Sequence, residues 1–568
     1  MNNDLSRVSL PLIICIIACL VSCFSGMGGH DLWTPDEPRA AAISLEMAAT
    51  GDMVIPSLAG SPFVEKPPLY FAVSAFMLHS FGSIIGNTAA LRLTAALFGI
   101  GVLLMTFLIA KKIGGIYSAV QSTLILATMV GFIQNYHWIR VDAALSFFIA
   151  ATVWCFVKVY YDDRPLWLIA AGFLISCAFL SKGIIGPVLI AVPWAGLVLY
   201  WAYGFMKNKS IAGSWIILHL LCFLAFAGLS GLWMIKLYFN GGEQLWNEWF
   251  WINQVGRFTG NAVGKGHLKE GEPFYYILQL LIYGMPWTPL FLFWFVQENI
   301  QAIKKRIITR ETFFLLVWGA GSVLLLSIPT TKRGIYLTPV LPAFAIMAGL
   351  GLQKLESKAF LYKWFKKYAV LWISLSVLLL CMIAAIPLIA RFIPGNISEK
   401  VFNTLIHPDY FHWCISSGTL FVLAIVLYVY KKQFSTQYKI VIATAMLFIA
   451  FWGLPAKAID AVKSMETDIQ QFVALIPKGE RNSIAGTKFS ETMLGSIYYY
   501  TGWKVPQIDD EMRIIKILKG NDKEYTALLV NKKKVRHKET ELVDFKYHIV
   551  QYTVTGRDRG LFLIKQQH

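Results

Sequence analysis

Residues 92–110 have the sequence RLTAALFGIGVLLMTFLIA, an apolar run that carries a charge only at Arg92. A helix needs about twenty apolar residues to cross the hydrocarbon core of a bilayer, so this stretch is long enough to be a transmembrane helix. Runs of similar length recur along most of the 568-residue chain. The sequence therefore predicts a polytopic α-helical membrane protein.

The composition of the whole chain indicates the same class. Hydrophobic residues make up 56% of the chain and charged residues 15%, whereas a soluble domain has about 25% charged residues. These proportions exclude a water-soluble enzyme, a disordered chain and a collagen-like or disulfide-stabilised scaffold.

The chain carries a formal net charge of +18. Its Lys and Arg clusters fall between the apolar runs, as the positive-inside rule expects of cytoplasmic loops. Attraction to anionic lipid head groups or phosphates is a second explanation of the excess. The sequence has no basic soluble segment interleaved with aromatic residues, so we expect no nucleic-acid partner.

The apolar runs define a topology. They lie near residues 9–28, 92–110, 115–133, 143–160, 166–181, 184–203, 214–235, 274–296, 312–328, 335–352, 368–390, 413–430 and 438–455. With the N-terminus in the cytoplasm, about thirteen spans place the intervening basic clusters, such as Lys111-Lys112 and Lys304-Lys305-Arg306, on the cytoplasmic side. The C-terminal segment then lies on the outer side of the membrane.

The first outer loop depends on how one short segment is interpreted. Pro68 to Phe81 is apolar, but its length of about fourteen residues fits an interfacial or re-entrant helix better than a span. A span here would turn most lysine clusters outward and would separate Asp36 from Asp142 across the membrane. We therefore predict that residues 29–91 form one periplasmic loop with helices on the membrane surface.

The composition changes near residue 456. Residues 483–485, 525–531 and 547–555 have strand-like content, and residues 491–501 can form a helix. These patterns predict a membrane domain over residues 1–455 and a small periplasmic α/β domain over residues 456–568. The second domain has no Gly-rich phosphate loop, and we expect no chemistry from it.

Charged and polar residues gather in the segments assigned to the outer face. Outer loops should be poor in Lys and Arg, and charges that break this bias near the bilayer indicate function. The sequence therefore predicts a cationic outer pocket that also holds carboxylates. Its candidate residues are Asp36, Glu37, Arg39, Glu65, Lys66, Asp142, Arg257, His267, Lys332, Arg333 and Tyr336.

Such a pocket suits group transfer from a phosphate-bearing lipid. Breaking a glycosyl–phosphate bond develops negative charge on the departing phosphate, which a nearby Lys or Arg stabilises in the transition state. A carboxylate opposite it could orient or deprotonate an acceptor, or bind an amino group on the sugar. The prolines that follow Glu65-Lys66 would present Lys66 rigidly.

Several of these elements resemble the GT-C membrane glycosyltransferases. They are Asp36-Glu37-Pro38-Arg39, Glu65-Lys66-Pro67-Pro68-Leu69-Tyr70, Arg140-Val141-Asp142 and the stretch from Lys332 to Pro339. The likeness covers roughly residues 5–350. It is strongest to the 4-amino-4-deoxy-L-arabinose transferases and more distant to the protein O-mannosyltransferases.

The resemblance implies a GT-C catalytic domain in the bacterial inner membrane with a periplasmic active site. The donor it implies is a sugar linked to undecaprenyl phosphate, with no nucleotide cofactor. Asp36, Asp142 and Lys66 would be the catalytic residues, with Lys66 on the donor phosphate. Substrate binding would fall to Arg39, Glu37, Arg257, Lys332, Arg333 and Tyr336. Glu65 and His267 would hold zinc or another divalent metal.

The acceptor decides what Asp36 does. A lipid A phosphate is already anionic, so Asp36 would position the donor or the acceptor, whereas a hydroxyl acceptor would need Asp36 as a general base. The leading hypothesis is transfer of aminoarabinose to lipid A, a lipopolysaccharide modification that gives resistance to polymyxin and other cationic peptides.

Two other hypotheses stay open. The same fold could act on a protein or another glycan. A lipid flippase or transporter would need ionisable residues within the spans, and the spans are mostly free of charge.

Overall fold

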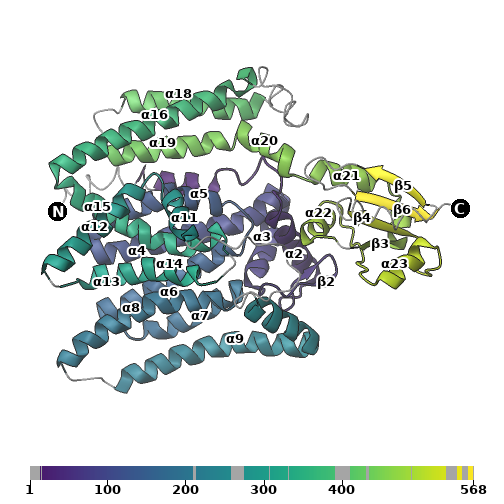
Figure 1. Ribbon diagram of the computed structural model, residues 1–568, viewed down its shortest axis with the longest axis horizontal. Helices are drawn as coiled ribbons and strands as arrows, with labels where there is room; N and C mark the ends of the chain where they lie inside the picture. The colour runs from purple at the N-terminus through teal and green to yellow at the C-terminus, as the bar shows by residue number, and fades with distance from the viewer. Residues whose placement is uncertain are drawn as a thin grey trace.

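The computed structural model forms a long helical bundle with a small sheet domain at one end (Figure 1). It describes residues 13–14, 16–208, 213–256, 274–305, 307–329, 332–389, 410–429, 434–487, 489–531, 547–552 and 561–566. Within these ranges, the membrane part contains α2 (Asp36–Thr50), α3 (Leu69–Ile85), α4 (Asn87–Thr128), α5 (Val130–Asn135), α6 (Asp142–Asp162), α7 (Trp167–Lys182), α8 (Ile185–Asn208), α9 (Gly213–Asn247), η1 (Glu248–Val255), α11 (Tyr275–Tyr283), α12 (Thr288–Lys305), α13 (Arg310–Leu316), η2 (Val317–Gly321), α14 (Ser322–Ser327), η3 (Gly334–Val340), α15 (Leu341–Glu356), α16 (Ala359–Ile389), α18 (Tyr410–Val429) and α19 (Thr436–Phe451).

The apolar helices confirm a multi-pass membrane architecture. Within the described part of the chain, six helices are long and apolar enough to cross a membrane, or up to eight if two bent helix pairs are each counted as one span. Shorter apolar helices include α3 and α7. The count of about thirteen spans stays a prediction from the sequence.

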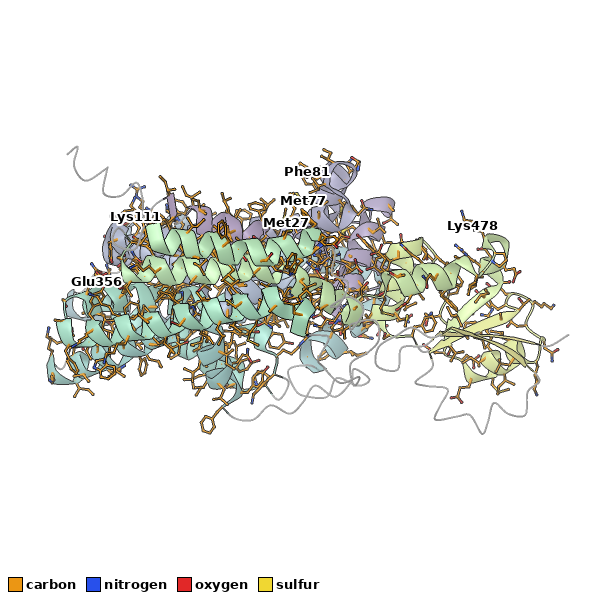
Figure 2. All side chains as sticks on the ribbon, turned by 90° about the horizontal axis from the view of Figure 1, so that it is seen from above. Met27, Met77, Phe81, Lys111, Glu356 and Lys478 are labelled. Carbon is orange, nitrogen blue, oxygen red and sulfur yellow. The ribbon has the colours of Figure 1, made fainter. Side chains whose placement is uncertain are left out.

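Two of the predicted runs, 92–110 and 115–133, fall largely on α4, which consists of two helices joined at a kink. Gly115 interrupts this helix with φ 81° and ψ −177°, a conformation that glycine adopts without the steric cost of a side chain. The basic pair Lys111-Lys112 therefore lies on the helix just before the break. Lys111 and Glu356 both lie at the end of the bundle away from the sheet domain (Figure 2).

Burial separates central helices from peripheral ones. In the most apolar 18-residue stretch of each segment, 78% of α6 and 89% of residues 334–356 is buried. The corresponding stretches of residues 215–255 and of α16 are only 11% and 17% buried. Large apolar side chains such as Phe223 on α9 and Leu371 on α16 are exposed. An apolar surface of this kind is suited to lipid.

The first loop, residues 29–91, contains α2, a two-stranded hairpin of β1 (Ser57–Leu58) and β2 (Ser61–Pro62), and α3. Asp36-Glu37-Pro38 is the first turn of α2. Acidic residues there interact favourably with the helix dipole, and proline is tolerated because the first turn has no intrahelical partner for its amide. α2 and α3 lie at the end of the bundle that faces the sheet domain (Figure 1).

A buried ion pair ties this loop to the bundle. The Arg92 guanidinium donates through Nε to Glu37 Oε1 at 3.0 Å and through Nη2 to Glu37 Oε2 at 3.0 Å. Both side chains are 1% exposed. Glu37 also accepts from the backbone amide of Trp33 at 2.8 Å. Glu37 thus fixes the chain that leads into α2.

We expect Arg92→Met to lower the free energy of unfolding by about 3–5 kcal/mol, because it leaves the Glu37 carboxylate buried without its cation. Thermal unfolding of the purified protein in detergent measures the loss. The double variant Arg92→Met/Glu37→Gln should lose less than the sum of the two single variants. Wild-type stability of Arg92→Met would contradict this role of the pair.

The C-terminal part contains α20 (Leu454–Lys463), α21 (Glu466–Ala474), η5 (Lys478–Ser483), β3 (Ile484–Thr487), α22 (Glu491–Thr501), α23 (Glu511–Leu518), β4 (Ala527–Asn531), β5 (Tyr547–Tyr552) and β6 (Leu561–Gln566). Its sheet has the order β3-β4-β6-β5, with β3 parallel to β4 and the other pairs antiparallel. The segments predicted as strands coincide with β3, β4 and β5, and the predicted helix coincides with α22. β6 was not predicted.

Candidate active site

A pocket lies where the first loop meets the starts of α6 and η3. About 570 Å3 of the region is not filled by atoms, and this volume includes open solvent at the mouth of the pocket. Its lining residues are Asp36, Arg39, Ala40, Phe63, Glu65, Lys66, Phe71, Ile139, Arg140, Val141, Asp142, Lys182, Arg333, Ile335 and Tyr336. Asp36 and Asp142 therefore share one pocket, as the predicted topology requires.

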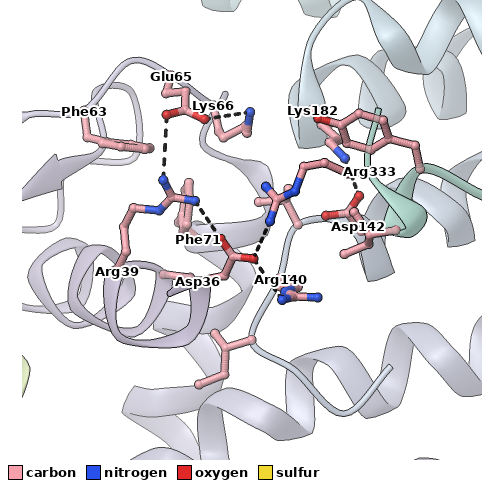
Figure 3. Close-up of a pocket in the computed structure, with 15 residues that line it drawn as sticks. Asp36, Arg39, Phe63, Glu65, Lys66, Phe71, Arg140, Asp142, Lys182 and Arg333 are labelled. Atoms are coloured by element: carbon pink, nitrogen blue, oxygen red, sulfur yellow. Dashed lines mark hydrogen bonds and ion pairs between the residues drawn. The ribbon is translucent and has the colours of Figure 1, made fainter. Parts of the chain in front are cut away.

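Asp36 is the centre of the pocket's ion-pair network. Its Oδ2 accepts from Arg333 Nη2 at 3.1 Å and lies 2.9 Å from Arg140 Nη2, while its Oδ1 accepts from Arg39 Nη2 at 3.3 Å. Figure 3 shows these three guanidinium groups converging on one carboxylate. Arg39 reaches it because residues three apart share a face of a helix.

These guanidinium groups decide the charge of Asp36. Burial alone would raise its pKa, but Arg140, Arg333 and Arg39 outweigh that effect and hold the pKa below its ordinary value of 3.8. A carboxylate with a lowered pKa is a weak base, because its ionised form is the stabilised one. Asp36 is therefore suited to holding cations in place.

Asp142 lies on the opposite side of the pocket, in the first turn of α6. It pairs with the ammonium group of Lys182, the last residue of α7. The Lys182 Nζ also lies 4.5 Å from the centre of the Tyr336 ring, within the range of a cation–π interaction. This contact joins α6, α7 and η3 at the pocket wall.

Glu65 and Lys66 occupy the loop that leads into α3. Lys66 Nζ lies 3.0 Å from Glu65 Oε1, and Arg39 Nη1 lies 3.8 Å from Glu65 Oε2. The lining contains five basic side chains (Arg39, Lys66, Arg140, Lys182 and Arg333) and three acidic ones (Asp36, Glu65 and Asp142). The excess of two positive charges favours an anionic ligand.

The structure brings seven of the eleven predicted site residues to this pocket: Asp36, Arg39, Glu65, Lys66, Asp142, Arg333 and Tyr336. Glu37 is instead buried against Arg92. Lys332 is half-buried and is not among the lining residues of the described chain. Arg257 and His267 lie outside the described residues.

Three residues of this network had no role in the sequence prediction. Arg140 belongs to the Arg140-Val141-Asp142 motif, but no role was predicted for it. Lys182 follows an apolar run, where a lysine is typical of a span end. Glu491 is on α22 of the C-terminal part, from which no chemistry was expected, yet its Oε2 pairs with Arg39 Nη1.

The divalent metal stays a prediction, because His267, one of its two predicted ligands, lies outside the described residues. Both carboxylate oxygens of Glu65 face cationic groups, which disfavour a further cation. Within the described part of the chain, no three His, Cys, Asp or Glu residues are grouped so that they could hold a metal ion. We therefore derive no chemical step from a metal.

The chain is similar to known membrane glycosyltransferases in sequence. Residues 24–241 match the family described as Dolichyl-phosphate-mannose-protein mannosyltransferase. An undecaprenyl phosphate-alpha-4-amino-4-deoxy-L-arabinose arabinosyl transferase of Aeromonas salmonicida is 27% identical over 359 residues, which cover 61% of this chain and 59% of that protein. A second one, from Proteus mirabilis, is 24% identical over 379 residues, or 63% of each chain. The chain thus spans about three fifths of the length of these curated relatives.

The fold is also that of a solved structure. The crystal structure of ArnT from Cupriavidus metallidurans bound to undecaprenyl phosphate matches with a TM-score of 0.72 and 18% identity, covering 98% of both chains. This match confirms the predicted GT-C architecture, and the sequence matches confirm the resemblance drawn from the motifs.

Proposed function

We propose that this chain, a multi-pass membrane protein with the GT-C fold of ArnT, is a glycosyltransferase that takes its sugar from a polyprenyl phosphate. More specifically, it moves 4-amino-4-deoxy-L-arabinose from undecaprenyl phosphate to a lipid A phosphate on the periplasmic face of the inner membrane. The names of the relatives support this sugar and this carrier.

The observation that carries the proposal is the cationic pocket with a carboxylate at its centre. Transfer breaks the bond between the sugar and the donor phosphate, and the departing phosphate gains negative charge. Five basic side chains line the space in which that charge would develop. We assign binding of the phosphate to Lys66 and Arg333, and Asp36 holds the three guanidinium groups of the pocket in position.

The charge of Asp36 also favours an anionic acceptor. Its pKa is held below 3.8, which makes it a poor base toward a hydroxyl group. A phosphate acceptor needs no deprotonation, and the excess of basic side chains would bind it. We therefore propose a phosphate of lipid A over a protein hydroxyl.

The test supplies purified protein with lipid A and labelled undecaprenyl phosphate-linked aminoarabinose. We expect a lipid A product heavier by one pentosamine, identified by mass spectrometry. A parallel reaction with a polyprenyl phosphate-linked hexose serves as the control for the sugar. Transfer of the label to protein, with unchanged lipid A, would overturn the proposed acceptor.

The ionisation of Asp36 gives a separate prediction. Because a lowered pKa means that the carboxylate keeps its charge until the pH falls below 3.8, Asp36 should bind no proton between about pH 5 and pH 8. Infrared difference titration of the wild type against Asp36→Asn should show no carboxylic acid band from Asp36 in this range. A band that appears near neutral pH would make Asp36 a competent base and would favour a hydroxyl acceptor.

A further inference from the structure

The C-terminal part contacts the pocket's wall through α22. Ser490 caps this helix, and its hydroxyl oxygen accepts from the backbone amide of Met493 at 3.2 Å. Glu491, the first helical residue, pairs through Oε2 with Nη1 of Arg39. Arg39 is thus bound at once by a residue of the C-terminal part and by carboxylates of the pocket.

The same helix also fixes the backbone of Arg39. A Cβ atom on Gly495 would come within 2.8 Å of the Arg39 Cα and 2.9 Å of the Pro38 carbonyl oxygen, so only glycine allows this approach. Thr492 donates its hydroxyl to the carbonyl oxygen of Pro35 at 2.9 Å. α22 therefore holds both the start of α2 and the tip of the Arg39 side chain.

Three carboxylates share the Arg39 guanidinium, and they differ in position. Asp36 lies 3.3 Å from Nη2 and Glu65 lies 3.8 Å from Nη1, and both line the pocket. Glu491 is the nearest partner of Nη1 and is not among the lining residues. Glu491 therefore holds Nη1 from outside the set of residues that line the pocket.

We propose that Glu491 is a positioning residue for the donor phosphate and acts through Arg39. This inference rests on the proposed function. Without Glu491, the Nη1 group loses its nearest partner and can move toward Glu65, which is 3.8 Å away, so the Arg39 guanidinium leaves the position in which it faces the pocket. The C-terminal part is in this way a component of the donor site.

The opposite hypothesis is that Glu491 competes with the donor for Arg39. The two hypotheses predict opposite changes in the affinity for the donor. Competition predicts that removing the Glu491 carboxylate tightens donor binding, whereas positioning predicts that it weakens binding. The Glu491→Gln variant separates charge from geometry, because its amide oxygen can still accept a hydrogen bond from Arg39.

The experiment measures the binding of undecaprenyl phosphate to full-length protein in nanodiscs, together with KM and kcat for the lipid-linked sugar. We expect Glu491→Ala to weaken binding and raise KM about tenfold, the size expected of a charge-assisted hydrogen bond. The turnover number should stay within about twofold. Glu491→Gln should lie between Glu491→Ala and the wild type.

Lys504→Met is the matched control. Lys504 Nζ pairs with Oε1 of Glu46 on α2 at 2.8 Å, so this variant removes another ion pair between the same two parts, outside the pocket. It should lower the unfolding temperature and leave donor binding unchanged.

Each outcome decides a separate point. Unchanged or tighter binding in Glu491→Ala overturns the positioning role, and so does an equal loss of binding in Lys504→Met. Failure of the wild type itself to bind undecaprenyl phosphate overturns the proposed function instead.

Discussion

Replacing Asp36 by asparagine is expected to lower the turnover number about a thousandfold, while binding of undecaprenyl phosphate stays unchanged or tightens. The variant keeps the size of the side chain and removes its charge. It thus separates the role of the carboxylate from the shape of the pocket.

The two halves of this result have different causes. The loss of turnover follows because Arg140 and Arg333 both lie near Asp36 Oδ2, at 2.9 and 3.1 Å, and an amide holds two guanidinium groups less well than a carboxylate. Binding is preserved because the pocket loses one of its three negative charges and keeps all five positive ones. The excess of positive charge therefore rises.

Transfer kinetics and lipid binding on the same preparation measure both effects. Asp162→Asn is the matched control, since Asp162 also pairs with two cations, Lys112 and Lys158, but does not line the pocket. Wild-type turnover in Asp36→Asn would remove Asp36 from the catalytic residues. Loss of lipid binding in the same variant would show that its carboxylate supports the donor directly.

The sequence was sufficient to predict a multi-pass membrane protein and to name six of the eight charged side chains that line the pocket. Span length and composition are local properties, so the apolar runs coincide with α6 to α9 and with later helices. The motifs around Asp36, Glu65 and Asp142 stand in segments assigned to one side of the membrane. A shared side made a shared pocket the natural expectation.

Helix geometry explains why one motif residue has a different place. Asp36 and Glu37 are neighbours in sequence, but successive residues of a helix point in directions about 100° apart. Asp36 therefore faces the pocket together with Arg39, whereas Glu37 faces Arg92 in the interior. The motif alone does not show which of the two residues lines the pocket and which pairs with Arg92, because that depends on how α2 packs against α4.

The residues that sequence reasoning missed depend on contacts between distant segments. Lys182 ends an apolar helix, and only the packing of α7 against α6 brings it to Asp142. Glu491 is 452 residues from Arg39 in the sequence. A single sequence carries no signal for either pair, because no local pattern links residues that meet only in the folded chain.

Lys66→Met should differ from Asp36→Asn by losing lipid binding as well as transfer. Lys66 lines the pocket with its side chain 16% exposed, and it is followed by Pro67 and Pro68, which restrict the backbone that presents it. Removing one charge that faces a developing anion costs about a hundredfold in turnover. Lys66→Arg should retain more activity because it keeps the charge.

The control for Lys66→Met is Lys478→Met, since Lys478 is exposed in the C-terminal part and does not line the pocket. Transfer at the wild-type rate in Lys66→Met would exclude Lys66 from the phosphate site.

The comparison of Lys66→Met with Asp36→Asn identifies the charge of the group that the pocket binds. If loss of the Lys66 charge weakens lipid binding while loss of the Asp36 charge does not, the group bound in the pocket is itself an anion. That is the property that a polyprenyl phosphate donor requires.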